Sequence, residues 1–188
     1  MSVQTTSSIS QTCREKLLAA VAAIGKCTEA KGRVLILSGG VDTCAILAAA
    51  SEVGVTFEAG FTVVTGDDSP DKNFASAAAT EKGLVHHIIH ITSEDLLITY
   101  LPACVQLLNT FDGMTLRNSL VVAAAFQKVK DLGYSCAVVG DGADELFGGY
   151  RSETKDCHCA CLVTASYHVS NLKTSLPYYQ LHVGMRRR

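Results

Sequence analysis

The sequence predicts an α/β fold, a three-layer sandwich in which a mostly parallel, twisted sheet lies between helices. Two observations carry this prediction. Short apolar runs rich in β-branched residues alternate along the chain with segments of helical spacing, and this alternation is typical of parallel strands joined by helical crossovers. Glycine-rich polar loops at Ser38–Gly40 and Gly140–Gly142 also follow directly on two of the apolar runs, at the strand ends where such folds bind ligands.

The elements follow in chain order. Residues 1–11 are rich in Ser and Thr and are expected to form a frayed end, and residues 13–29 have apolar positions at helical spacing (Leu17, Leu18, Val21 and Ile24). The chain divides into an N-terminal helical segment over 1–30, a core domain over 31–150 and a divergent tail over 151–188, in which no periodicity predicts further elements. Strands are predicted at 33–37, 56–65, 85–91 and 135–139, and helices at 41–53, 70–82, 93–108 and 115–132.

The composition limits the classes of protein. With 188 residues, 48% of them hydrophobic, the chain can bury a substantial core. A net charge of −2 gives no attraction for nucleic acid or an anionic membrane. Apolar stretches stay below the roughly 20 residues that cross a bilayer, and the N-terminus has no pattern of a signal or transit peptide. These features predict a cytoplasmic globular protein.

The 8 cysteines are scattered without a CxxC pair, as expected for reduced thiols in the cytosol. Cys157, His158, Cys159 and Cys161 lie close together in the tail. Their alternate spacing is not the usual zinc pattern, so both a metal site and an irregular tail stay open.

The segment Ser38–Thr43, SGGVDT, has the features of a phosphate-binding loop. Its two glycines allow close approach of the backbone to an anion, and the helix that follows offers unpaired N–H groups and the positive end of its dipole. Asp42 would be an unusual neighbour for phosphate unless a cation lay between them, which predicts Mg²⁺. A purely structural turn is the alternative, and neither a Walker motif nor GxGxxG is present.

Two motifs carry a resemblance to a known family. SGGVDT resembles the SGGxDS/T signature of the PP-loop ATP pyrophosphatases, and Val139–Tyr150, VGDGADELFGGY, resembles the SGEGSDELFGGY stretch of asparagine synthetases and β-lactam synthetases. The resemblance covers residues 30 to 150. Weaker similarities within it are Phe61–Val63, Ser69–Asp71, Gly83–His87, and Phe111–Asp112 with Leu116–Arg117 and Ser119.

The resemblance to the asparagine synthetases implies a fold of the PP-loop, adenine nucleotide α-hydrolase-like type, with ATP and Mg²⁺ as cofactors. It implies that Asp42 and Asp144 hold the metal, and that Asp141 takes the catalytic place of the family's Glu beside a β-aspartyl-adenylate. The pyrophosphate would be cradled by Ser38, Gly39, Gly40, Asp42 and Thr43, and the adenosine held through backbone contacts by Leu37, Val63, Val139 and Gly140.

For the two acidic residues of the second motif and for the histidines of the third predicted strand, a purely structural role is an alternative. Asp141 and Asp144 could act as a helix N-cap and a first-turn charge. His86, His87 and His90 are expected to alternate between the faces of a strand, and a metal site is the alternative.

The chain also departs from the family. Asp141 is one methylene shorter than Glu, and a misplacement of about 1 Å can cost about a hundredfold in rate. Glutamine-dependent members begin with a catalytic Cys, whereas this chain begins Met1-Ser2, so ammonia is expected to come free or from a partner. Residues 151–188 do not resemble the family's C-terminal region, which carries a catalytic Lys.

Three functions follow from these patterns. The first is an amide synthetase that activates a carboxylate, aspartate above all, as an acyl-adenylate for attack by ammonia. The second is a truncated, weak or inactive ATP-binding subunit, and the third is another PP-loop enzyme that acts on tRNA. The expected partners are small molecules, not nucleic acid or membranes, with a homodimer or an ammonia-supplying subunit in addition.

Overall fold

The computed structural model describes residues 3–27, 32–66, 69–141, 143 and 165–168. Helices and strands alternate through most of this range, as the sequence predicts. In chain order they are α1 (Val3–Cys27), β1 (Arg33–Ile36), α2 (Val41–Val53), β2 (Ala59–Val64), α3 (Pro70–Glu81), β3 (Val85–His90), α4 (Ser93–Leu108), α5 (Gly113–Asp131), β4 (Cys136–Val139) and β5 (Ala165–His168).

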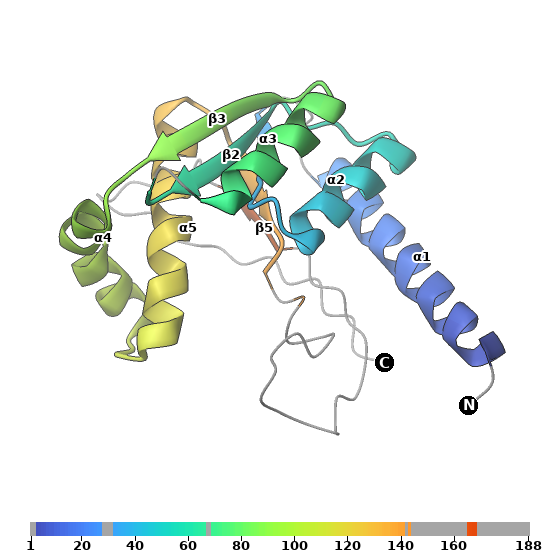
Figure 1. The fold of residues 1–188 in the computed structure, drawn as a ribbon, viewed down its shortest axis with the longest axis horizontal. Helices are drawn as coiled ribbons and strands as arrows, with labels where there is room; N and C mark the ends of the chain where they lie inside the picture. The colour runs from blue at the N-terminus through green and yellow to red at the C-terminus, as the bar shows by residue number, and fades with distance from the viewer. Residues whose placement is uncertain (1–2, 28–31, 67–68, 142, 144–164, 169–188) are drawn as a thin grey trace.

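The strands form one sheet in the order β3-β2-β1-β4-β5 (Figure 1). The pairs β2–β3, β1–β2 and β1–β4 are parallel, and β5 runs antiparallel to β4 with Cys136 opposite His168. The predicted mostly parallel sheet is therefore confirmed. An edge strand at 165–168 was not predicted, because four residues without a long apolar run give too little periodicity to distinguish a strand from a loop.

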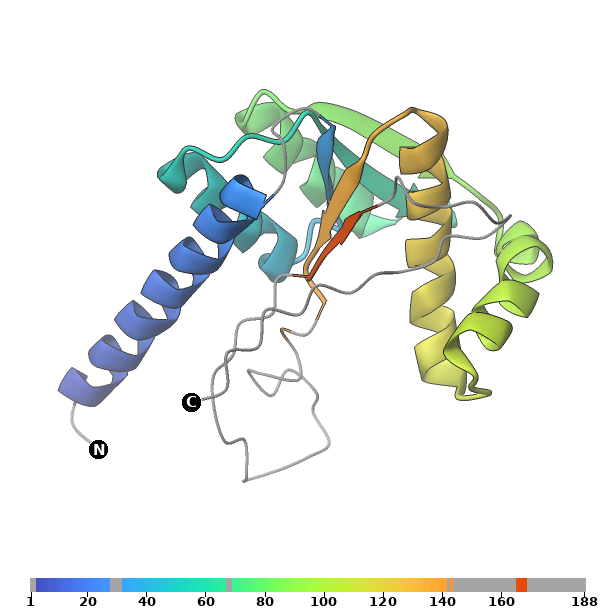
Figure 2. The same ribbon diagram turned by 180° about the vertical axis from the view of Figure 1, so that it is seen from behind.

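Helices cover both faces of the sheet and make the predicted three-layer sandwich. Side chains alternate between the faces of a strand, so Leu35 packs among the buried residues of α1, α2 and α3, whereas Val34 packs beside Phe126 and Val129 of α5. A third apolar cluster joins α4 to α5 through Leu96, Cys104, Leu116 and Leu120. Figure 2 shows α4 and α5 lying together on one side of the sheet and α1 on the other.

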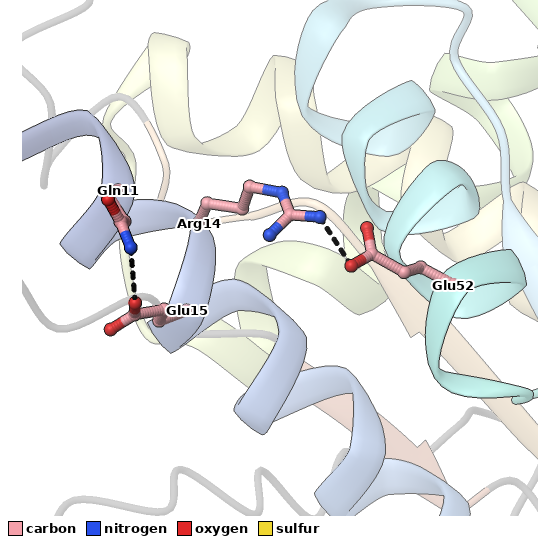
Figure 3. A network of polar contacts seen from close by, with 4 residues as sticks. All are labelled: Gln11, Arg14, Glu15 and Glu52. Atoms are coloured by element: carbon pink, nitrogen blue, oxygen red, sulfur yellow. Dashed lines mark hydrogen bonds and ion pairs between the residues drawn. The ribbon is translucent and has the colours of Figure 1, made fainter. Parts of the chain in front are cut away.

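Helix α1 begins at Val3, so the expectation that residues 1–11 form a frayed end is wrong for the described part of that segment. Ser and Thr are only modestly unfavourable inside helices, and the Thr12 hydroxyl donates to the Ser8 carbonyl one turn earlier, at 2.9 Å. Farther along, the Arg14 guanidinium forms an ion pair with Glu52 of α2 (Figure 3). Val21, in the second half of α1, is fully buried against the sheet side of the molecule.

Arg33 lies at the amino end of β1 and is only 2% exposed. Its guanidinium donates to the Thr56 carbonyl at 3.2 Å and to the Gly25 carbonyl at 3.5 Å. Glu58 also bonds this end of the strand, since its carboxylate accepts from the Gly32 N–H at 2.8 Å. Polar contacts therefore hold α1, β1 and the segment before β2 together at the amino ends of the strands, opposite the glycine-rich loops.

In the part of the chain that the structure describes, no helix is both long enough and apolar enough to cross a membrane. The cysteines Cys13, Cys44, Cys104 and Cys136 are free thiols. The cluster Cys157, His158, Cys159 and Cys161 lies outside the described residues.

Candidate nucleotide-binding site

The two glycine-rich loops lie at the point where the sheet changes direction. β1 is followed by α2 and then by its neighbour β2, whereas β4, the neighbour on the other side, is reached through α4 and α5 on the opposite face. In open parallel sheets, the crevice beyond the carboxyl ends of strands at such a switch point is where ligands bind. The loops at Ser38 and Gly140 extend from the two strands that flank this point.

The loop after β1 leads into an α2 terminus that no N-cap side chain covers. Gly40 occupies the N-cap in an extended conformation and provides no side-chain hydrogen bond. The Ser38 hydroxyl accepts from the Gly40 N–H at 3.2 Å and lies 3.2 Å from the Thr43 hydroxyl. The Thr43 hydroxyl also reaches the Gly40 carbonyl, at 3.3 Å. Hydroxyls and the positive end of the helix dipole thus converge where an anion would bind.

Gly39 holds this loop against α3. Its φ is +81°, a left-handed conformation that favours glycine. A Cβ on Gly39 would lie 2.6 Å from the Asp71 carbonyl oxygen and 2.7 Å from the Ala75 nitrogen, both backbone atoms that cannot rotate away. The backbone of the loop therefore packs directly on the first turns of α3, so that the helix start at Ser69–Asp71 supports the loop.

Gly140 brings the start of the second motif against the first. A Cβ on Gly140 would lie 3.1 Å from Thr43 Cγ2 and 3.2 Å from Asp42 Cβ. Asp141 follows at once and is exposed to solvent. The structure therefore brings Ser38, Thr43, Asp42, Gly140 and Asp141 together at one sheet edge. Asp144, the other expected metal ligand, lies outside the described residues.

The residues expected to hold adenosine occupy the strand ends beside these loops. Val63 belongs to β2 and is half-buried, and Val139 is the last residue of β4 and 2% exposed. Leu37 follows β1; its N–H donates to the Phe61 carbonyl at 2.8 Å, and its carbonyl accepts from the Thr62 hydroxyl at 2.5 Å. The Leu37 N–H thus extends the hydrogen bonding between β1 and β2. The Leu37 carbonyl oxygen has two lone pairs, so it can accept a second hydrogen bond besides that from Thr62.

The histidines of β3 alternate between faces, as the strand pattern predicts. His86 Nε2 lies 2.7 Å from the Thr62 hydroxyl, while His87 stacks on Phe61 with ring centroids 4.8 Å apart. Burial, with a smaller contribution from His87, lowers the pKa of His86. Among the described residues, no three His, Cys, Asp or Glu side chains gather as a metal site. The link between Thr62 and His86 was missed from the sequence, and the only signal was their place on neighbouring strands.

The glutamine-dependent NAD+ synthetase from Acinetobacter baumannii, solved with adenosine diphosphate, has a similar fold at a TM-score of 0.51 and 20% identity, over 73% of this chain and 27% of that one. Among curated proteins, an asparagine synthetase of Asparagus officinalis is 32% identical over 126 residues, and asparagine synthetase B of Escherichia coli is 35% identical over 82.

The sheet with a glycine-rich loop at its switch point defines an α/β protein with a fold of the PP-loop type. The family model described as asparagine synthase matches residues 13–177, and the chain belongs to that family. The match is wider than the resemblance over 30–150, since it takes in most of α1 and also β5. The match to the Asparagus protein covers 62% of this chain and 21% of that protein. The match to the Escherichia coli protein covers 44% of this chain and 15% of that protein. The chain spans about a fifth of such relatives or less.

Proposed function

We propose that this chain binds Mg²⁺-ATP at the Ser38–Thr43 loop and cleaves it between the α and β phosphates, activating a carboxylate, aspartate in the first place, for amide formation with ammonia. The observation that supports this most is the close approach of Gly140 to Thr43. It sets the two motifs that the asparagine synthetases share side by side at the switch point of the sheet. Membership of the asparagine synthase family supports the same reaction class.

The proposed reaction has two steps, and atoms balance in each. A carboxylate oxygen of the acid attacks the α-phosphorus, the bond to the bridging oxygen breaks, and pyrophosphate leaves. Ammonia then attacks the acyl carbon, loses a proton, and expels AMP. The α2 N-terminus and the hydroxyls of Ser38 and Thr43 would stabilise the negative charge that builds on the departing pyrophosphate, because such donors are already oriented before the reaction.

Asp42 fits a bound cation. It lies in the first turn of α2 and is half-buried, directly beside the anion site, so its carboxylate would repel phosphate unless a divalent ion lay between them. Asp144 is the proposed second ligand, by resemblance. When bound, Mg²⁺ neutralises charge on the departing phosphates. Asp141, one residue after Gly140 and exposed, would support the activation of the acid substrate.

The test is to incubate the chain with Mg²⁺-ATP, aspartate and ammonium and to measure pyrophosphate and asparagine. We expect pyrophosphate release that depends on aspartate. Asp42→Asn should weaken Mg²⁺-ATP binding at least tenfold, the equivalent of about 1.4 kcal/mol. The matched control is Asp95→Asn, which removes the same charge from the first turn of α4, away from the site, and should bind ATP normally.

Each result has a distinct meaning. Calorimetric binding of ATP without pyrophosphate release would favour a nucleotide-binding subunit over a synthetase. Loss of binding in the Asp95 variant would show that the effect of Asp42 is not local. If the unmodified chain does not bind Mg²⁺-ATP, the proposed nucleotide site is wrong.

A further inference from the structure

Behind the phosphate loop, a chain of polar groups crosses the sheet from β3 to β1. Thr62 of β2, which is 3% exposed, stands at its centre. The Thr62 hydroxyl lies 2.5 Å from the Leu37 carbonyl oxygen and 2.7 Å from His86 Nε2. On the far side of the imidazole, His86 Nδ1 lies 3.4 Å from the hydroxyl of Ser76, a residue of α3. The four groups link α3, β3, β2 and the end of β1.

The protons in this chain can be assigned by counting donors. The Leu37 carbonyl can only accept, so the single proton of the Thr62 hydroxyl is directed to it. In the contact between Thr62 and His86, Nε2 must then be the donor and Thr62 the acceptor. A neutral imidazole with its proton on Nε2 leaves Nδ1 as an acceptor, which the Ser76 hydroxyl satisfies. The neutral form agrees with the lowered pKa of His86.

Leu37 is the last residue before the proposed phosphate loop, so this chain of bonds ends at the start of that loop. The register between β1 and β2 ends with Ile36 opposite Phe61, and Leu37 adds one further bond from its N–H to the Phe61 carbonyl. The Thr62 hydroxyl then holds the carbonyl of Leu37. Because a peptide unit is planar, fixing that carbonyl also fixes the direction of the Ser38 N–H, the first donor of the loop.

We infer that Thr62 and His86 are positioning residues for the nucleotide: the bonds from Ser76 through His86 and Thr62 to Leu37 orient the Leu37–Ser38 peptide, and through it the phosphate loop. This inference rests on the proposed function. The printed bonds of both side chains lead to Leu37 and Ser76, so both would act on the nucleotide through the loop. The next residue of the loop, Gly39, packs directly on α3, so α3 contacts the loop at Gly39 and is linked to it a second time through Ser76.

The first experiment reads the bonds without any nucleotide. In the unmodified protein, nitrogen-15 NMR of the His86 side chain at neutral pH should show the proton on Nε2, with Nδ1 as the unprotonated nitrogen. Thr62→Val keeps the shape of the side chain but removes the hydroxyl, and it should shift the backbone amide signal of Ser38. A proton on Nδ1, or an unchanged Ser38 signal in Thr62→Val, would overturn the inference.

The second experiment measures Mg²⁺-ATP binding by calorimetry. Thr62→Val should weaken binding about tenfold, the scale of one well-made hydrogen bond, whereas Thr62→Ser retains the hydroxyl and should bind within about twofold of the unmodified protein. His86→Phe should weaken binding to a similar degree. The double variant should lose little more, because both changes break the same chain of bonds.

The two experiments separate this inference from the function on which it rests. Equal weakening by Thr62→Val and Thr62→Ser, or full additivity in the double variant, would overturn the positioning role while leaving ATP binding intact. If the unmodified protein does not bind ATP, the proposed function fails, and the NMR results alone then decide whether the bonds orient the loop.

Discussion

Gly140 and Thr43 approach each other at the carboxyl ends of the strands, so closely that a Cβ on Gly140 would lie 3.1 Å from Thr43 Cγ2. The residues are far apart in the sequence, one after β4 and the other in the first turn of α2. This close approach brings the loop after β1 and the loop after β4 together in one candidate site. A larger side chain at position 140 would therefore have to displace Thr43 or Asp42.

Gly140→Ala should therefore weaken Mg²⁺-ATP binding by several-fold, about 1 kcal/mol, because the new methyl group pushes Thr43 and Asp42 aside. Gly140 has an ordinary φ, so the backbone itself carries no strain. Gly113→Ala is the control, since a Cβ there meets nothing within 4 Å. Calorimetry and urea unfolding of both variants check the prediction, and equal ATP affinities would contradict it.

Gly39, in the Ser38–Thr43 loop, has a matched control in Gly54, which follows α2. Both have positive φ, +81° and +73°, but a Cβ would clash with α3 backbone only at Gly39 and would meet nothing at Gly54. Gly54→Ala should lower the free energy of unfolding by about 1 kcal/mol, the cost of the left-handed conformation. Gly39→Ala should cost at least about 2 kcal/mol more, as overpacking of rigid atoms does. Equal losses in urea unfolding would show that the loop moves away from α3 freely.

Arg33→Met should lower the free energy of unfolding by about 1–3 kcal/mol, because it leaves the Thr56 and Gly25 carbonyls without their charged donor. Methionine retains much of the aliphatic packing of this buried side chain. Arg14→Met is the control, since the Arg14–Glu52 pair is 61% and 47% exposed and such surface pairs contribute less than about 1 kcal/mol. A larger loss in Arg14→Met would contradict the ranking.

Asp112 begins α5 as its N-cap, with its carboxylate accepting from the Thr115 N–H at 2.7 Å. A hydrogen bond from the Thr115 side chain, together with the bond from the Thr115 N–H, lowers the pKa of Asp112 below its ordinary value of 3.8. The carboxylate therefore stabilises the fold above the pKa of the unfolded state, and this stabilisation is lost as the pH falls through the folded pKa.

Asp112→Asn retains an oxygen that can cap the helix but does not titrate. The unmodified protein should be the more stable of the two at pH 7, and the difference in unfolding free energy should shrink below about pH 4. Urea unfolding at several pH values measures the difference. A gap that stays constant with pH would show that the charge of Asp112 contributes nothing.

Most of the core domain could be predicted from the sequence because its elements are long and regularly spaced. The run RVLIL before Ser38 and the alanine-rich segment after it gave β1 and α2 nearly to the residue. The start of α1 was missed, since Ser and Thr favour helix caps and turns and so obscured a helix that begins at Val3. The family model matches as far as residue 177 and so includes β5. The four residues of β5 are too few to show a strand periodicity in the sequence.

For the site, the sequence placed the phosphate loop and Gly140 at one sheet edge because topology alone decides where strand ends meet. It did not reveal the bond from Thr62 to Leu37, which depends on the register between β1 and β2. Register is set by the packing of whole strands and is not visible in a local pattern. The histidines drew attention to β3, but only the structure shows which of them faces Thr62.

The place of β5 has a consequence for how the protein is made. β4 is buried along its whole length and carries no charge, and β5 covers the backbone edge that β4 would otherwise expose. Until residue 168 has left the ribosome, the nascent chain presents Cys136–Val139 as an open strand, the kind of edge that pairs with other chains. Synthesis that stops after the second motif should therefore yield a product that aggregates, even though both sequence motifs of the proposed ATP site would already have been made.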